Sequence, residues 1–306
     1  MKFDNSVLAF KRVVLGLGLV GILGAGGAAM VFPGSAGASP LVLPADSPLF
    51  IKFSNREQLS AENFTTDFGD GVTITENSWG VLRIDTIRGG VVDEPNNLIG
   101  GGDAPPIFAD QLTHNAQITG IFYGLEAHPD SGGAPLASTG GLLDLYWRDV
   151  GTLGVTSLAS ALPEDRTAPD QFTGFTEGDF LVRLAFASGI SSDPVTTLVG
   201  DILPTAQSPF SGLAAGYFNV DYSKIGAWTE ALDGNWFNTE FGPRDLRFDN
   251  RYTSLASWDG DPGVVGALSD DPVQAFTTAV PEPKSIALLG LGLLALVFIT
   301  RRRLTA

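Results

Sequence analysis

The fold class of this chain is decided by the stretch FLVRLAF, residues 180–186. Large apolar residues occupy every second position from Phe180 to Phe186, and the charge of Arg183 falls between them. Such alternation is typical of an antiparallel strand with one face in the core and the other in solvent. The pattern therefore predicts that Leu184→Asp unfolds the domain and that Arg183→Asp is tolerated.

The same alternation recurs along the chain, in Leu82–Asp85, Leu143–Arg148, Phe218–Tyr222 and Leu246–Tyr252. Shorter candidate strands are Leu49–Phe53, Val72–Thr75 and Ile118–Leu125, the last apolar on both faces and so expected at the centre of a sheet. Without a repeating strand–helix rhythm, about eight strands predict an all-β fold, an antiparallel β-sandwich of jelly-roll type. We expect short helices at Glu57–Glu62 and Ser223–Leu232, and long loops at Gly89–Pro106, His128–Gly141 and Ser160–Gly174.

The N-terminal segment, residues 1–38, has the three parts of a secretory signal peptide. Lys11 and Arg12 precede an apolar run, Val13–Phe32, and small residues follow. Ala36 and Ala38 fit the pockets of signal peptidase, which predicts cleavage between Ala38 and Ser39. We therefore expect export across the inner membrane.

The C-terminal tail, residues 281–306, also has three parts in a fixed order. The first part is Pro281, Glu282 and Pro283. Two prolines so close together cannot lie inside a helix, so they are expected to mark the end of the folded domain. An uncharged apolar segment, 285–300, is expected to form a short transmembrane helix of about 22 Å, which flanking basic side chains extend by snorkelling. Arg301, Arg302 and Arg303 then hold the end in the cytoplasm.

This tail resembles the PEP-CTERM sorting signal of Gram-negative bacteria. The resemblance implies recognition by an exosortase, a membrane-embedded thiol protease, with cleavage near Pro281–Pro283 and transfer to the cell surface. A permanent C-terminal anchor is the alternative, although an anchor has no need of the Pro-Glu-Pro sequence. The phrases Tyr217–Asp221 and Asp245–Asn250 also look like recurrent sequence in exported PEP-CTERM proteins.

The intervening region, residues 39–280, is expected to be an acidic β-rich extracytoplasmic domain. It holds 11 Lys and Arg against 32 Asp and Glu, a net charge near −21 compared with −16 for the whole chain. This charge argues against binding to nucleic acid, which needs a basic surface. The chain has no cysteine, so disulfides and thiol chemistry are excluded.

Catalytic motifs are missing from the sequence, which holds only two histidines, His114 and His128, and no G-x-S-x-G. We therefore expect no enzyme activity and no required cofactor. Weak candidates for a structural calcium site are the carboxylate-rich turns of Asp67, Asp70, Asp259 and Asp261. Candidates for stacking on sugar rings are Trp228, Trp236 and Trp258.

Three functions remain open from the sequence. The first is a non-catalytic protein of the cell surface or of an extracellular matrix of exopolysaccharide and biofilm. The second is a carbohydrate- or calcium-binding module of that matrix, and the third is a secreted hydrolase that uses two carboxylates.

Overall fold

A computed structural model of the protein describes residues 39–100, 105–128, 134–201 and 210–278. The predicted signal peptide and sorting tail lie outside these residues. Most of the described chain is β-strand: β1 (Pro48–Asp67), β2 (Thr73–Glu94), β3 (Asn97–Gly100), β4 (Phe108–Ala109), β5 (Ala116–Ala127), β6 (Leu136–Asp149), β7 (Arg166–Ala168), β8 (Gln171–Phe172), β9 (Asp179–Ala187), β10 (Thr196–Gly200), β11 (Ser211–Val220), β12 (Phe237–Thr239), β13 (Gly242–Arg244), β14 (Leu246–Ser254) and β15 (Val265–Phe276). Two short α-helices are α1 (Val150–Leu153) and α2 (Thr229–Leu232).

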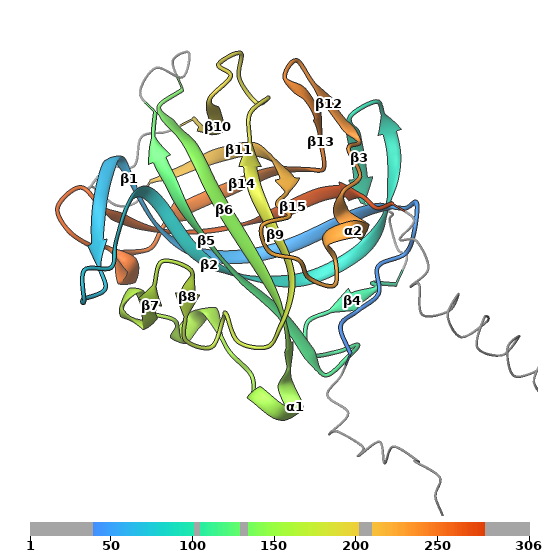
Figure 1. Ribbon diagram of the computed structural model, residues 1–306, viewed down its shortest axis with the longest axis horizontal. Helices are drawn as coiled ribbons and strands as arrows, with labels where there is room; N and C mark the ends of the chain where they lie inside the picture. The colour runs from blue at the N-terminus through green and yellow to red at the C-terminus, as the bar shows by residue number, and fades with distance from the viewer. Residues whose placement is uncertain (1–38, 101–104, 129–133, 202–209, 279–306) are drawn as a thin grey trace, which may run out of the picture. The chain divides into compact units, whose positions relative to one another are not determined.

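The long strands form one antiparallel sheet that closes on itself. β1 pairs with β2 along one edge and with β15 along the other. From β2 the pairing continues through β5 and β6 to β11, β14 and β15. Two short strands, β9 and β10, lie one after the other between β6 and β11. Each pairs with both of these strands, but with different segments of them. The two halves of this sheet face each other (Figure 1).

The predicted all-β, antiparallel, sandwich-like fold is confirmed. Its connections are simpler than those of a jelly roll, because each long strand pairs with the next long strand along the chain. Jelly rolls instead contain Greek-key connections between strands that are not neighbours in sequence. The expected central strand is also confirmed: Ile118–Leu125 lies in β5, between β2 and β6.

The inward residues of the alternating strands make the main core. Leu184 and Phe186 of β9 face it, as do Leu143 and Leu145 of β6. Phe180 departs from the predicted face, because the β6–β9 register shifts between Leu145 and its neighbour and turns Phe180 outward. A single extra residue in one strand is a β-bulge, which reverses the faces beyond it.

The predicted helix at Glu57–Glu62 is wrong, because these residues continue β1 and pair with β2 and β15 as far as Leu59. In Ser223–Leu232, only Thr229–Leu232 is α-helical. The predicted loop at Gly89–Pro106 holds the end of β2 and all of β3. Within the described residues, no helix is long and apolar enough to cross a membrane.

A second, smaller cluster packs on the outer face of the sheet. Segment 150–178, which connects β6 to β9, carries Phe172 and Phe175 against Trp79 of β2. Trp258 stacks on Phe172, with ring centroids 6.2 Å apart and planes 11° apart. The cluster explains why several outward positions of β2 and β5 are apolar: a long connection covers them.

The two ends of the domain are joined by hydrogen bonds. The hydroxyl of Thr277 donates to the carbonyl of Pro44 (2.6 Å) and accepts from the amide of Ser47 (3.0 Å). Thr278 donates through its amide and its hydroxyl to the carbonyls of Ala231 and Glu230. The fold is therefore fixed up to Thr278, immediately before the predicted sorting tail.

Candidate functional site

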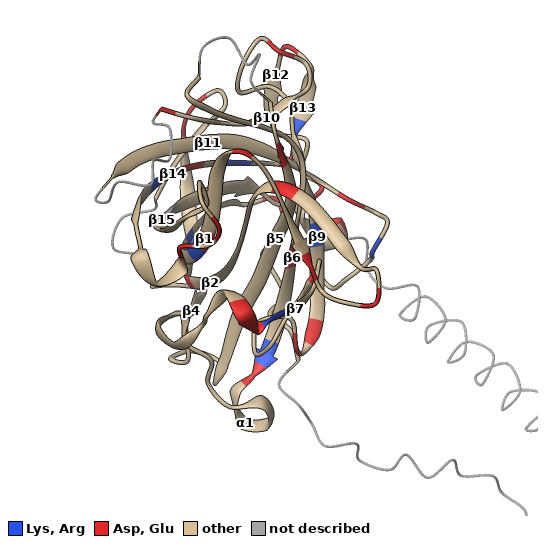
Figure 2. Ribbon diagram, turned by 90° about the vertical axis from the view of Figure 1, so that its left-hand side faces the viewer, with Lys and Arg blue, Asp and Glu red and all other residues tan. Residues whose placement is uncertain are grey.

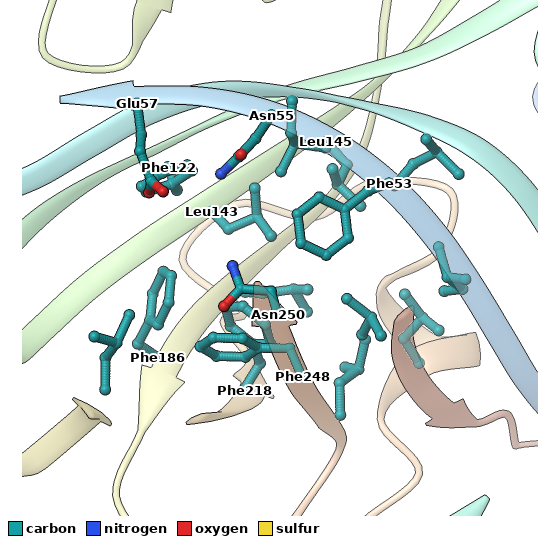
Figure 3. A pocket seen from close by; sticks show the side chains of 18 of the residues that line it. Phe53, Asn55, Glu57, Phe122, Leu143, Leu145, Phe186, Phe218, Phe248 and Asn250 are labelled. Atoms are coloured by element: carbon teal, nitrogen blue, oxygen red, sulfur yellow. The ribbon is translucent and has the colours of Figure 1, made fainter. Parts of the chain in front are cut away.

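An internal cavity of about 70 Å³ lies between the two halves of the sheet. Nearly all of its wall is apolar and comes from the inward faces of the long strands, with Phe53, Leu143, Leu145, Phe218 and Phe248 among the lining residues (Figure 3). The cavity follows from the alternation that predicted the strands, because each strand directs its large apolar residues toward the same interior.

Two glycines make room for aromatic rings in this wall. A Cβ at Gly216 would lie 2.6 Å from Cε1 of Phe248, and one at Gly80 would lie 2.8 Å from Cε1 of Phe122. Both rings line the cavity. Carbon atoms in contact need about 3.5–4.0 Å, so any larger residue would collide with the ring and also with a backbone carbonyl, that of Thr197 at Gly216 and that of Arg56 at Gly80.

One part of the wall is polar and is built from β1 and β14, and Ser269 of β15 links the two strands behind it. Asn250 donates from Nδ2 to Oγ of Ser269 (3.1 Å), and Ser269 donates from Oγ to Oδ1 of Asn55 (2.5 Å). Asn55 also hydrogen-bonds the carboxyl group of Glu57. Oδ1 of Asn250 is buried and has no hydrogen-bond partner. Figure 3 shows the carboxyl of Glu57 directed into the cavity, on the same side as Asn55.

Burial gives Glu57 unusual proton affinity. Glu57 is only 9% exposed, and loss of solvation raises the pKa of its carboxyl to about 7, with the hydrogen bond from Asn55 acting in the opposite direction. Of the described residues that line the cavity, Glu57 is the one with a titratable side chain, so no basic group shares the space with it. The carboxyl therefore changes charge near neutral pH.

We expect Glu57→Gln to change how stability depends on pH. The pKa of Glu57 lies near 4.5 in the unfolded chain and about 7 in the fold, so its favourable contribution is complete below about pH 4.5 and is lost as the pH rises to 7. Relative to the wild type, the glutamine variant should gain on the order of 3 kcal/mol in free energy of unfolding between these pH values. Urea unfolding at pH 4.5, 6 and 8 measures this difference. A difference that stays constant with pH would contradict the burial of the charge.

The 223–232 segment closes one part of the cavity. Trp228 and Leu232 both line it, and Trp228 is 1% exposed. The indole nitrogen of Trp228 donates to the carbonyl of Leu41 (2.6 Å), which fixes the segment to the start of the domain. Because Thr278 bonds to Glu230 and Ala231, the last described residue of the domain contacts the same short helix.

Two buried ion pairs lie outside the cavity, on the outer face of the sheet. Arg183 binds Asp144 through Nε and Nη2, both at 2.7 Å, and the Asp144 side chain is fully buried. The hydrogen bonds to Asp144 raise the pKa of Arg183. Arg166 pairs with the fully buried Glu76 and lies over the ring of Trp79, 4.3 Å from its centroid. Figure 2 shows how acidic and basic residues are distributed over the fold.

The expectation that Arg183→Asp is tolerated is wrong in its premise, because Arg183 is the partner of a buried carboxylate. We now expect this change to lower the free energy of unfolding by about 3–5 kcal/mol, since it puts a second carboxylate beside buried Asp144 and leaves it only Lys224, whose Nζ lies 3.4 Å from Oδ2. Lys52→Asp makes the same change of charge at an exposed position of β1 and should cost far less. Chemical denaturation of the two variants separates these outcomes, and equal stabilities would contradict the assignment.

The tryptophans predicted to stack on sugars do not form an exposed platform. Trp228 and Trp258 are 1% and 0% exposed, and the indole of Trp258 donates to the carbonyl of Ala161. Trp236 is half-buried and stacks on Phe276, with ring planes 5° apart. The prediction is therefore wrong for Trp228 and Trp258, which belong to the two cores.

The four candidate calcium ligands lie in exposed turns. Asp67 accepts a hydrogen bond from the amide of Gly69, and Asp259 accepts one from the amide of Gly266. Asp70 has a positive φ of 52°, as turns often require, and Asp261 accepts a backbone hydrogen bond that closes its own turn. Across the described part of the chain, no three residues of the metal-binding types lie close enough together to hold an ion.

The C-terminal tail follows directly after this hydrogen-bonded domain, and it is here that a comparison with known families gives a match. Residues 279–303 match the family model described as the PEP-CTERM protein-sorting motif. The chain carries a PEP-CTERM sorting signal. The match contains Pro281, Glu282, Pro283 and the three arginines, so the resemblance found in the sequence is confirmed. The protein is accordingly an exported target of an exosortase.

The PEP-CTERM match covers the tail and none of the residues that the structure describes. No curated protein and no solved structure matches the chain. The polar wall of the cavity was not predicted from the sequence, because Glu57 was placed in a short helix. Its signal was present nonetheless: Asn55 and Glu57 stand at alternate positions after Ile51 and Phe53, on the inward face of one strand.

Proposed function

We propose that this PEP-CTERM protein is a non-catalytic component of the cell surface or of the extracellular matrix, held among exopolysaccharide and biofilm. The sorting motif is the observation that carries the proposal, because it directs the chain to an exosortase. The strongly acidic domain suits a soluble, hydrated surface layer. The signal peptide would bring the chain across the inner membrane, and the tail would hold it there until processing.

The structure also supports release by cleavage in the motif. Thr277 and Thr278 are bonded to Pro44, Ala231 and Glu230, so the last strand is secured before residue 279. A cut within or after Pro281–Pro283 would therefore remove the tail without removing any strand of the domain.

The two alternative functions gain less support from the geometry. A sugar-binding face would need exposed aromatic rings, and two of its three candidates are buried. A hydrolase would need two carboxylates free to act in a cleft. The buried carboxylates of Glu76 and Asp144 are instead paired with arginines. A structural calcium remains a prediction that the exposed turns neither require nor favour.

The proposal is tested by fractionating the producing cells and sequencing both ends of the recovered protein by mass spectrometry. We expect an N-terminus at Ser39, a C-terminus near Pro281–Pro283, and recovery with the surface and matrix fraction. In cells that make no exopolysaccharide, the protein should instead appear in the medium. Recovery in the cytoplasm, or an N-terminus at Met1, would contradict export.

A further inference from the structure

We propose that the internal cavity binds a short aliphatic amine as its ammonium ion, with N–H donors directed at the carboxylate of Glu57 and at Oδ1 of Asn250. This inference goes beyond the surface role proposed above and does not depend on it. Its starting point is two buried groups in the cavity wall: a carboxyl that Asn55 hydrogen-bonds but no cation pairs with, and an amide oxygen without a donor.

Other buried carboxyls of the domain show what Glu57 lacks. Glu76 is paired with Arg166 and Asp144 with Arg183. Asp245 accepts hydrogen bonds from the backbone amides of Val220 and Asn235. Glu57 has the amide of Asn55 alone, and no ion pair joins it to any described residue. An isolated buried carboxylate is costly, so a cation entering the cavity would relieve that cost.

The unpaired oxygen of Asn250 adds a second, independent requirement for a donor. Asn250 is 7% exposed and lines the cavity, and its Nδ2 is already engaged by Ser269. Leaving a buried acceptor without a partner costs about 1–3 kcal/mol. An ammonium group carries three donors and no acceptor, which matches a wall that offers acceptors and no free cation.

The apolar part of the cavity wall determines what the rest of the ligand must be, and the cavity volume limits its length. It is made of leucine, isoleucine, valine and phenylalanine side chains, with Trp228 at one part. Aliphatic carbons would bury their surface there, and the aromatic rings of Phe122 and Phe186 also attract a cation. The cavity, about 70 Å³, is roughly half the volume of an engineered cavity that admits benzene. A chain of about three to five heavy atoms therefore fits without rearrangement.

Three probes of equal length test the head group. Titration calorimetry on the exported protein purified from producing cells compares n-butylammonium, 1-butanol and butyrate at pH 8. We expect butylammonium to bind most tightly, butanol at least about tenfold more weakly, and butyrate not at all, because Glu57 repels an anion. Binding of butylammonium should weaken as the pH falls below 7, whereas binding of butanol should not, which tests the proposal without any substitution.

Two variants of the same strand complete the test. Glu57→Gln should weaken butylammonium about tenfold and leave butanol unchanged, while Glu62→Gln, at an exposed position of β1, should leave both unchanged. Equal affinity for butylammonium and butanol would overturn the proposal, as would a Glu57→Gln variant that binds butylammonium as well as the wild type. Absence of binding by all three probes would also overturn it.

Discussion

Replacing Leu184 with aspartate should leave the domain unfolded. Leu184 is 1% exposed, lines the cavity, and lies between Leu143 of β6 and Val220 of β11. The carboxylate would enter an apolar interior where the nearest strands offer it no cation, at a cost of several kcal/mol. Loss of the leucine side chain itself adds about 2–5 kcal/mol. Together these costs approach the whole stability of a typical domain, about 5–15 kcal/mol.

Circular dichroism and urea titration of the variant check this expectation. The wild type should show a β-sheet spectrum and one cooperative transition, and Leu184→Asp should show neither. Leu213→Asp provides the control, because Leu213 lies on β11 with 44% of its surface exposed. A folded Leu184→Asp protein with a wild-type transition would show that β9 does not face the core in this register.

The strands could be predicted wherever one face is buried and the other is solvated. This holds for β9, β6 and β14, whose alternation is visible in the printed sequence. It fails for β15, where the charges of residues 270 and 271 and the proline at 272 interrupt the pattern. β15 forms nonetheless because it pairs with both β1 and β14. The formation of β15 therefore depends on partner strands that are distant in sequence, and the local sequence pattern gives no information about these partners.

The closure of the sheet and the buried ion pairs could not be predicted from the sequence either, because they too depend on contacts between residues that are distant in sequence. Asp144 and Arg183 were both assigned to solvent by alternation, and they do lie on the outer face. Their burial comes from neighbouring side chains, including Lys224, whose Nζ donates to Oδ2 of Asp144 (3.4 Å) and to the hydroxyl of Tyr146 (3.0 Å). Alternation predicts the face of a side chain, whereas its exposure depends on which segments cover that face.

The cavity and the tail represent opposite cases for inference. The tail has a short linear motif, so residues 281–306 alone predict its role, and the family model, which matches residues 279–303, agrees. The polar wall of the cavity depends on Asn55 and Glu57 and on Asn250, which lies almost 200 residues further along the chain and meets them only after the sheet closes. The sorting motif can therefore be recognised from a short stretch of sequence, whereas the cavity and its polar wall can be recognised only from the three-dimensional structure.

Changing Glu282 to alanine should block processing of the tail while leaving the protein inserted in the membrane. The Pro-Glu-Pro sequence lies within the matched motif and begins three residues after Thr278, the last described residue, which the domain holds by hydrogen bonds. Proline disfavours helix both at its own position and at the residue before it, so from the sequence we expect this segment to be extended, the form in which a protease reads a substrate. Replacing both Pro281 and Pro283 with alanine should have the same effect. Immunoblots of membrane and surface fractions would then show full-length protein in place of the shortened form.

The arginine cluster provides the contrasting change. Neutral residues in place of Arg301, Arg302 and Arg303 remove the charges that stop transfer through the membrane, so retention should weaken while the Pro-Glu-Pro sequence stays intact. A permanent anchor predicts the reverse for Glu282→Ala, namely no effect, because the sequence would then be a simple linker. Full-length wild-type protein that persists in membranes containing an active exosortase would therefore contradict sorting and would favour the anchor. Shortened wild-type protein at the surface, together with full-length Glu282→Ala protein in the membrane, is the result we expect.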